Sequence, residues 1–138
     1  MTTDTTTRKK YGSLFDLYLK FDNGFTMNLC RDLMVLDKQD LLSLIPTTLK
    51  GTVLKGAPTF LEPFKVIISV FPQANVLQFR KEILLNFPHF SQSTPWIPHI
   101  PIKTAADERE QRELLDELNR TPRHFYVIEE VLLVPSPS

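Results

Sequence analysis

Histidine is the residue of this sequence best suited to proton transfer, and the chain has three, His89, His99 and His124. An imidazole takes up and releases a proton near neutral pH, so two facing histidines can act as base and acid. The histidines lack the spacing of a metal-binding pair, and Cys30 is the single cysteine, which excludes a cysteine metal cage and an internal disulfide. The sequence also has no glycine-rich phosphate loop and no G-x-S-x-G turn. We therefore predict no metal and no cofactor.

His99 lies in the most distinctive stretch, Pro95-Trp96-Ile97-Pro98-His99-Ile100-Pro101-Ile102. This stretch resembles the second signature of the 2H phosphoesterase superfamily, in which an aromatic residue and Pro-His precede an apolar residue, Thr or Ser, and another apolar residue. The superfamily includes 2′-5′ RNA ligase-like proteins and cyclic phosphodiesterases. The order of the flanking elements is also similar, with a strand and a helix expected before the stretch and a helix and a strand after it.

The resemblance implies a bilobal fold in which two His-x-Thr/Ser motifs face each other across a cleft. One histidine would act as base and the other as acid on a 2′,3′-cyclic or 2′-5′-linked nucleotide, and the hydroxyls would hold phosphate oxygens. This sequence departs from both motifs. Pro101 takes the second hydroxyl position, and a proline has neither a side-chain donor nor a backbone N–H. The first motif best matches 25–29, where Thr26 replaces the histidine and Asn28 the hydroxyl residue.

The resemblance thus implies a catalytically impaired protein that binds a nucleotide or an RNA end in the cleft. His99 is the predicted catalytic residue, a ligand contact that survives without catalysis, or an ordinary histidine between two prolines in a strand. Four further residues are predicted ligand contacts: Thr26, Asn28, Trp96 and Lys103. An indole can stack on a base, and an ammonium group can neutralise a phosphate.

Two other functions stay open. An active 2′,3′-cyclic or 2′-5′ phosphodiesterase would need His89 or His124 as the partner of His99. A non-enzymatic interaction or structural subunit of a larger assembly would instead present the Phe- and Pro-rich loop 87–98 or the acidic helix 104–119 to a protein partner.

Apolar periodicity predicts the elements that must position these residues. Strands are expected at 11–21, 25–36, 64–71, 96–102 and 124–134, and helices at 37–45, 76–87 and 105–119. Asn23-Gly24 is typical of the tight turn of a hairpin, and a bulge is expected near Glu129-Glu130, where the alternation slips. Asn75 and Thr104 are the expected N-caps of the second and third helices. The segment 47–63 is expected to be irregular.

Length and composition indicate one globular domain, since the chain has 138 residues of which 42% are hydrophobic and 23% charged. We predict an α+β fold with an antiparallel or mixed sheet and helices packed on it. The domain is expected at 11–134, with lobes at 11–62 and 63–134 and tails at 1–10 and 135–138.

The charge balance and the hydropathy argue against two classes of binding partner, polyanions and membranes. Basic and acidic residues are equal in number, 16 each, which argues against generic binding of polyanions. No apolar run approaches the ~20 residues of a membrane-spanning helix, and no signal peptide is visible. The sequence therefore predicts a cytoplasmic protein that does not bind a membrane.

Overall fold

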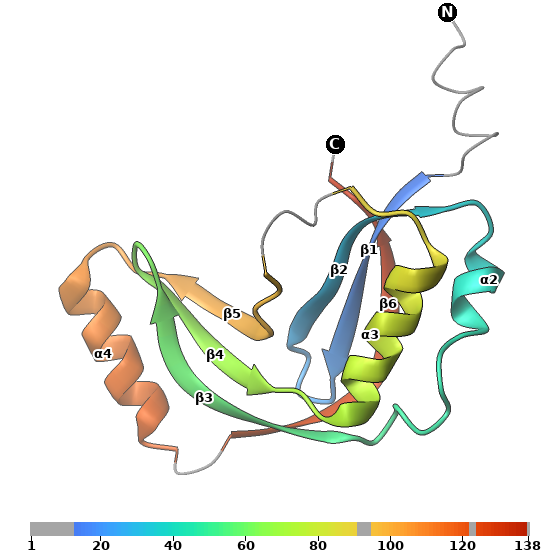
Figure 1. The fold of residues 1–138 in the computed structure, drawn as a ribbon. Helices are drawn as coiled ribbons and strands as arrows, with labels where there is room; N and C mark the ends of the chain where they lie inside the picture. Colours follow the sequence, from blue (N-terminus) through green and yellow to red (C-terminus); the bar gives the residue numbers. More distant parts are fainter. Residues whose placement is uncertain (1–12, 91–94, 122–123, 138) are drawn as a thin grey trace, which may run out of the picture.

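A computed structural model describes residues 13–90, 95–121 and 124–137. Six strands and three helices of this part form an α+β unit, as predicted (Figure 1). The strands are β1 (Ser13–Phe21), β2 (Thr26–Val35), β3 (Val53–Leu61), β4 (Lys65–Phe71), β5 (His99–Thr104) and β6 (His124–Pro135). The helices are α2 (Lys38–Leu42), α3 (Ala74–Asn86) and α4 (Glu108–Asn119). None of these helices is long and apolar enough to cross a membrane.

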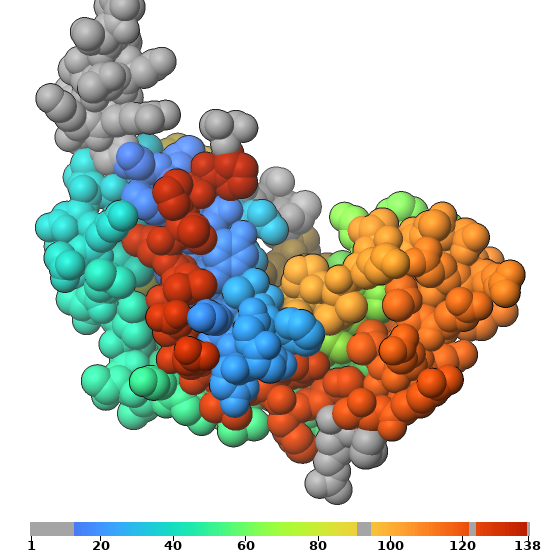
Figure 2. Space-filling view, turned by 180° about the vertical axis from the view of Figure 1, so that it is seen from behind, coloured from blue at the N-terminus to red at the C-terminus, as the bar shows by residue number. Residues whose placement is uncertain are grey.

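All six strands belong to one antiparallel sheet, in the order β2-β1-β6-β3-β4-β5. The long strand β6 pairs with β3 through its first part and with β1 through its second part. The sheet curves strongly, so that its two edge strands, β2 and β5, come close together (Figure 1). Figure 2 shows the surface hollowed between the N-terminal strands and the β5 region.

The first two strands form the predicted hairpin. Gly24 has a φ of 90° in the turn, which glycine adopts without steric cost. The inward-facing residues of β1 are all buried: Phe15, Leu17, Leu19 and Phe21. The buried face of α3, which carries Val76, Phe79 and Ile83, belongs to the same hydrophobic core. The core therefore places α3 beside β2, which is the strand that carries the predicted first motif.

The prediction that 47–63 is irregular is wrong, because residues 53–61 form β3. Gly56 and Pro58 hid this strand, since both residues are unusual inside strands. A Cβ on Gly56 would meet the Ile68 side chain at 2.5 Å, so this position needs glycine. Pro58 lies beyond the stretch that pairs with β6, so its missing N–H is not required there. The predicted lobe boundary at 62/63 falls in the β3–β4 hairpin.

Helix α2 begins next to its predicted start, whereas α3 does not have its predicted cap. Asp37, the predicted first residue of this helix α2, is its N-cap, because its carboxylate accepts the Gln39 N–H (2.9 Å), and α2 ends at Leu42, before the predicted limit. Gln73 is the N-cap of α3, so the prediction of Asn75 is wrong. Asn75 lies inside the first turn, where its amide donates to Thr52 Oγ1 at 2.9 Å. This contact ties the helix to the segment before β3.

Thr104 is not the cap of α4, contrary to the prediction. It ends β5, where it pairs with Lys65 of β4. Asp107 takes the capping role, because its carboxylate accepts the Glu110 N–H (2.9 Å). The fifth strand accordingly occupies 99–104 instead of 96–102.

The predicted bulge in β6 is confirmed. Lys20 pairs with Glu130 and Phe21 with Ile128, so Glu129 has no partner on β1. Beyond the strand, the Ser136 N–H donates to the Leu14 carbonyl (3.0 Å). The described part of the predicted 135–138 tail therefore lies against β1, and the predicted 1–10 tail lies outside the described residues.

Candidate functional site

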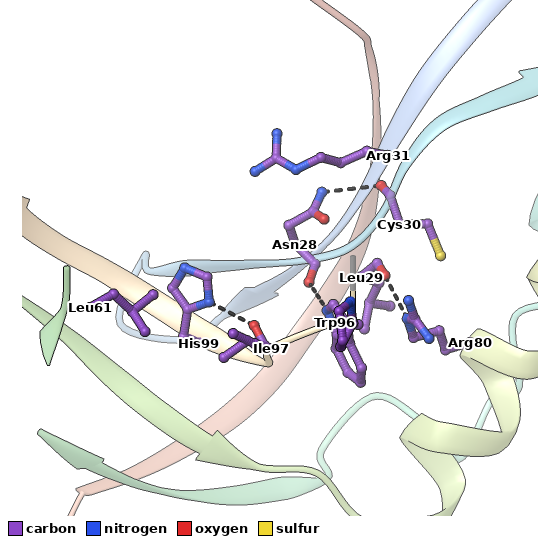
Figure 3. A pocket seen from close by; sticks show the side chains of 10 residues that line it. Asn28, Leu29, Cys30, Arg31, Leu61, Arg80, Trp96, Ile97 and His99 are labelled. Atoms are coloured by element: carbon purple, nitrogen blue, oxygen red, sulfur yellow. Dashed lines mark hydrogen bonds between the residues drawn. The ribbon is translucent and has the colours of Figure 1, made fainter. Parts of the chain in front are cut away.

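A cavity of about 230 Å³ lies between β2 and the segment that leads into β5 (Figure 3). Its lining residues are Asn28, Leu29, Cys30, Arg31, Leu61, Arg80, Pro95, Trp96, Ile97 and His99. Three predicted site residues, Asn28, Trp96 and His99, thus come together although β2 and β5 are the opposite edges of the sheet.

Trp96 and Arg80 bind the exposed backbone of β2. The Trp96 Nε1–H donates to the Asn28 carbonyl at 3.0 Å, and the Arg80 Nε–H donates to the Leu29 carbonyl at 2.8 Å. The Arg80 guanidinium also lies over the indole, with 4.3 Å between its carbon and the ring centroid. An edge strand has carbonyls without a strand partner, and these two side chains satisfy two of them. This wall of the cavity is therefore held by side chains that contact each other.

Burial changes the pKa of two neighbouring groups at this wall. Burial lowers the pKa of the Arg80 guanidinium below its usual value. Burial also raises the pKa of the Cys30 thiol to about 12, an effect that the charge of Arg80 partly opposes. Because only a thiolate is a good nucleophile, Cys30 is an inert, protonated thiol at neutral pH.

Asn28 offers a ligand one polar group. Its Nδ2 donates to the Cys30 carbonyl (3.1 Å) and to the Leu17 carbonyl (3.4 Å), so both amide protons are engaged. The Oδ1 atom is left, and an amide oxygen can only accept. Asn28 therefore suits a sugar hydroxyl, and not the phosphate oxygen that the resemblance implied.

His99 has one ring nitrogen fixed by the backbone. Its Nδ1 lies 2.7 Å from the Ile97 carbonyl oxygen. Because a carbonyl only accepts, we assign the proton to Nδ1, which leaves the Nε2 lone pair open in the neutral ring. The imidazole is half-buried at the first residue of β5, and Arg31 and His99 extend from facing edges of the sheet (Figure 3).

Sequence reasoning missed Arg31 and Arg80. Neither arginine forms an ion pair with any residue that the structure describes, and no Asp or Glu lines the cavity. A signal for Arg31 was present, because strict alternation from Met27 would put residue 31 in the core, where a lone guanidinium is costly. No comparable signal marked Arg80, which belongs to a helix far away in the sequence.

Thr26 and Lys103 do not line this cavity. Thr26 is the first residue of β2 and lines a separate groove with Asp16 and Tyr18. Lys103 donates to Glu110 Oε1 of α4 at 2.6 Å. This hydrogen bond lowers the pKa of Glu110. The Lys103 ammonium group thus has a carboxylate partner outside the cavity.

The other two histidines lie elsewhere. His124 Nε2 is 3.0 Å from the Leu118 carbonyl oxygen, so it donates there, and Nδ1 accepts from the Tyr126 hydroxyl at 3.2 Å. His89 forms an isolated bridge with Leu33 and lines a groove with residues 84–88. The cavity therefore holds one imidazole, that of His99.

The lining of the cavity suits an anion, since its described residues combine two guanidinium groups and an imidazole with no carboxylate. Within the described ranges, no three His, Cys, Asp or Glu side chains lie close enough together to hold a metal ion. In comparisons with known proteins, no family model matches the chain and no curated protein has a similar sequence.

Proposed function

We propose that this chain binds the phosphate of a nucleotide or an RNA end in the cavity between β2 and β5, without cleaving it. The observation that supports this function is the convergence of Arg31 and His99 on one cavity from the two edges of the sheet. A guanidinium group matches two phosphate oxygens at once, and a protonated imidazole donates to a third.

Each lining residue has a role that its contacts allow. Arg31 holds the phosphate, since no described carboxylate pairs with it. His99 donates from Nε2 when its ring carries a second proton, because Nδ1 is occupied by Ile97. Asn28 accepts from a ribose hydroxyl through Oδ1. Trp96 supports the sugar or base, with its indole fixed by Asn28 and Arg80.

The size of the cavity favours a ligand that places no more than one nucleotide unit in it. Its volume of about 230 Å³ lies below the range of roughly 300–1,000 Å³ that is usual for drug-sized ligands. A longer strand would need further cationic surface, and the chain has no net charge. The ligand class is therefore a mononucleotide or the terminal nucleotide of an RNA.

We expect no cleavage because the described lining of the cavity has too few groups that can transfer a proton. Cleavage of a phosphodiester by acid and base needs two groups that exchange protons, and His99 is the one imidazole of the cavity. Pro101 occupies the position of the motif hydroxyl.

We also propose that β1, β2 and the second part of β6 correspond to one lobe of a 2H-like fold, and the other strands to the second lobe. The cavity then lies where these lobes meet.

A second candidate, the interaction subunit, is favoured by one surface. Leu36, Leu85 and Phe90 are 68%, 72% and 65% exposed, and a groove beside Phe87 is lined by two of them. Exposed apolar side chains that gather in this way are common at protein interfaces. The charged side chains of α4, by contrast, pair along the helix itself, as in Arg109–Glu113. This alternative therefore uses the 87–98 loop and not the 104–119 helix.

Titration with 2′,3′-cyclic AMP and with a 2′-5′-linked adenylate dimer tests the proposal. Trp96 is the single tryptophan, so its fluorescence reports on the cavity directly. We expect a saturable change without product, and an affinity about 10–100-fold lower in Arg31→Ala, because a charged hydrogen bond contributes about 1.5–3 kcal/mol. Lys103→Ala is the matched control, since this cation lies outside the cavity, and it should bind normally.

Two results would overturn the proposed function. Unchanged fluorescence at millimolar ligand would leave the interaction subunit as the better explanation. Product that disappears in His99→Ala would show an active phosphodiesterase instead, with a second proton carrier that the cavity lining does not include.

A further inference from the structure

Strand β2 contains two bulges, one on each side of Cys30. Tyr18 pairs with Asn28, but Leu17 pairs with Cys30, so one extra residue of β2 stands between these pairs. The next pair along the hairpin is Phe15 with Leu33, which again leaves one extra residue on β2. Each bulge shifts the register by one residue and therefore reverses which side chains face the core.

The bulges decide where Arg31 points. Without them, the alternation that buries Met27 would continue through residues 29 and 31, and Arg31 would lie opposite the buried Phe15. With them, Cys30 takes the inward position opposite Leu17 and is 2% exposed. Arg31 is instead exposed and lines the cavity. The register of β2 therefore decides both orientations: Cys30 faces the core, and Arg31 faces the cavity.

Asp16 supports the second bulge from the neighbouring strand. Its carboxylate is 2% exposed, and Oδ1 accepts the backbone N–H of Asp32 at 3.0 Å. Asp32 has a φ of 52°, a left-handed conformation that is uncommon outside glycine. The same Oδ1 accepts the Ser136 hydroxyl at 2.6 Å. A buried carboxylate is costly unless it is hydrogen-bonded, and here its bonds fix the backbone next to Arg31.

If Leu33 and Val35 keep their buried places, loss of this second bulge would set Arg31 opposite Leu17 and Cys30 opposite Tyr18. We propose that Asp16 is a positioning residue, which holds the bulge at Asp32 and so keeps Arg31 on the cavity side and Cys30 on the core side. The part of this inference that concerns ligand binding rests on the proposed function. The part that concerns the register does not, because Cys30 reports it without any ligand. Ser136 assists Asp16 from the end of the chain that follows β6.

Native-state alkylation of Cys30 and binding of 2′,3′-cyclic AMP test the inference together on the full chain. Asp16→Ala should raise the alkylation rate about 10-fold or more and weaken binding about as much as Arg31→Ala, since a bond to a charged group is lost. Asp16→Asn keeps an oxygen at Oδ1 and should behave like the unmodified chain. Ile83→Val is the control, because it lowers the stability of the chain at α3, away from the bulge. It should leave ligand binding unchanged and raise the alkylation rate of Cys30 no more than its loss of stability explains.

Two further variants act on the bulge itself. Asp32→Val places a β-branched residue at the left-handed position and should expose Cys30 even if Asp16→Ala does not fold. Asp32→Gly adopts this conformation freely, so the double variant Asp16→Ala/Asp32→Gly should recover Cys30 protection and ligand binding.

The outcomes separate the two proposals. Absence of binding in the unmodified chain, with Cys30 exposed by Asp16→Ala, would reject the ligand and keep the role of Asp16 in the register. Two results together would overturn the positioning role. Ligand binding would be weakened by Arg31→Ala and not by Asp16→Ala, and Cys30 would stay protected from alkylation in both Asp16→Ala and Asp32→Val.

Discussion

The indole of Trp96 donates a 3.0 Å hydrogen bond to the carbonyl of Asn28, a residue 68 positions earlier in the chain. Asn28 belongs to one edge strand of the sheet, and Trp96 leads into the other. This side-chain to backbone hydrogen bond therefore joins the two edges beside the cavity, where the sheet has no strand-to-strand pairing. This contact explains how one wall of the cavity combines β2 with the segment before β5.

Replacement of Trp96 by phenylalanine tests this contact. Trp96→Phe keeps an aromatic ring near Arg80 but removes the N–H, so the Asn28 carbonyl loses its partner. We expect the free energy of unfolding to fall by about 1–3 kcal/mol, as for a part-buried acceptor left unpaired with some loss of packing. Urea denaturation measures the change. Phe90→Leu, at an aromatic residue that is 65% exposed, is the control and should change stability by less than about 0.5 kcal/mol.

Cys30 should make stability depend on alkaline pH. Burial raises its pKa in the folded chain from the ordinary 9.0 to about 12. Between these values the unfolded chain loses a proton that the folded chain keeps, so ionisation favours unfolding. The contribution of Cys30 is complete below about pH 9 and falls as the pH rises toward 12. Urea denaturation from pH 8 to pH 10.5 should show this loss, and Cys30→Ala should show less of it.

Thiol chemistry checks the same property independently. Iodoacetamide at pH 8 should alkylate folded Cys30 far more slowly than the unfolded chain, because the thiolate is the reactive form and the side chain is buried. A Cys30→Ala chain that carries Lys50→Cys, at an exposed position, supplies the fast reference. Equal alkylation rates for the two folded proteins would show that Cys30 is accessible and contradict the raised pKa.

The fold was predictable where its signals are local. The alternation of β1, the Asn23-Gly24 turn and the start of a helix at Asp37 each depend on a few adjacent residues, and all are present in the structure. Strand β3 was missed because Gly56 is required by Ile68 of the next strand, a contact that no local pattern shows. Apolar alternation along one segment does not reveal a strand whose residues are determined by packing against a neighbouring strand.

The candidate site was predictable in part for the same reason. Trp96 and His99 lie in one distinctive stretch, and the cavity contains both. Arg31 was missed because the two bulges of β2 change the facing of residues in a way that depends on a carboxylate 16 positions away from Asp32. Lys103 was assigned to the site because its pairing with Glu110, seven residues later, follows from the packing of α4.

Gly56→Ala should destabilise the sheet. The added Cβ would lie 2.5 Å from Ile68 Cγ2 and 3.0 Å from the Tyr126 ring, so the packing of these two side chains must change. We expect a loss of about 1–3 kcal/mol in the free energy of unfolding, as is typical of overpacked cores. Ile68→Ala in the same chain removes the closest atom, so the double variant should lose less than the sum of the two single variants. Additive losses in urea denaturation would contradict the steric explanation.

Arg80→Lys separates the shape of the guanidinium from its charge. A lysine keeps the cation but cannot donate to the Leu29 carbonyl with the same geometry while it lies flat on the Trp96 indole. We expect a loss of about 1–2 kcal/mol in stability, from one hydrogen bond and part of a cation–π contact. The Trp96 emission spectrum should change with it, because the indole loses its planar neighbour. Lys81→Arg, on the exposed side of the same helix, should alter neither property. An unchanged spectrum in Arg80→Lys would show that charge alone holds this wall of the cavity.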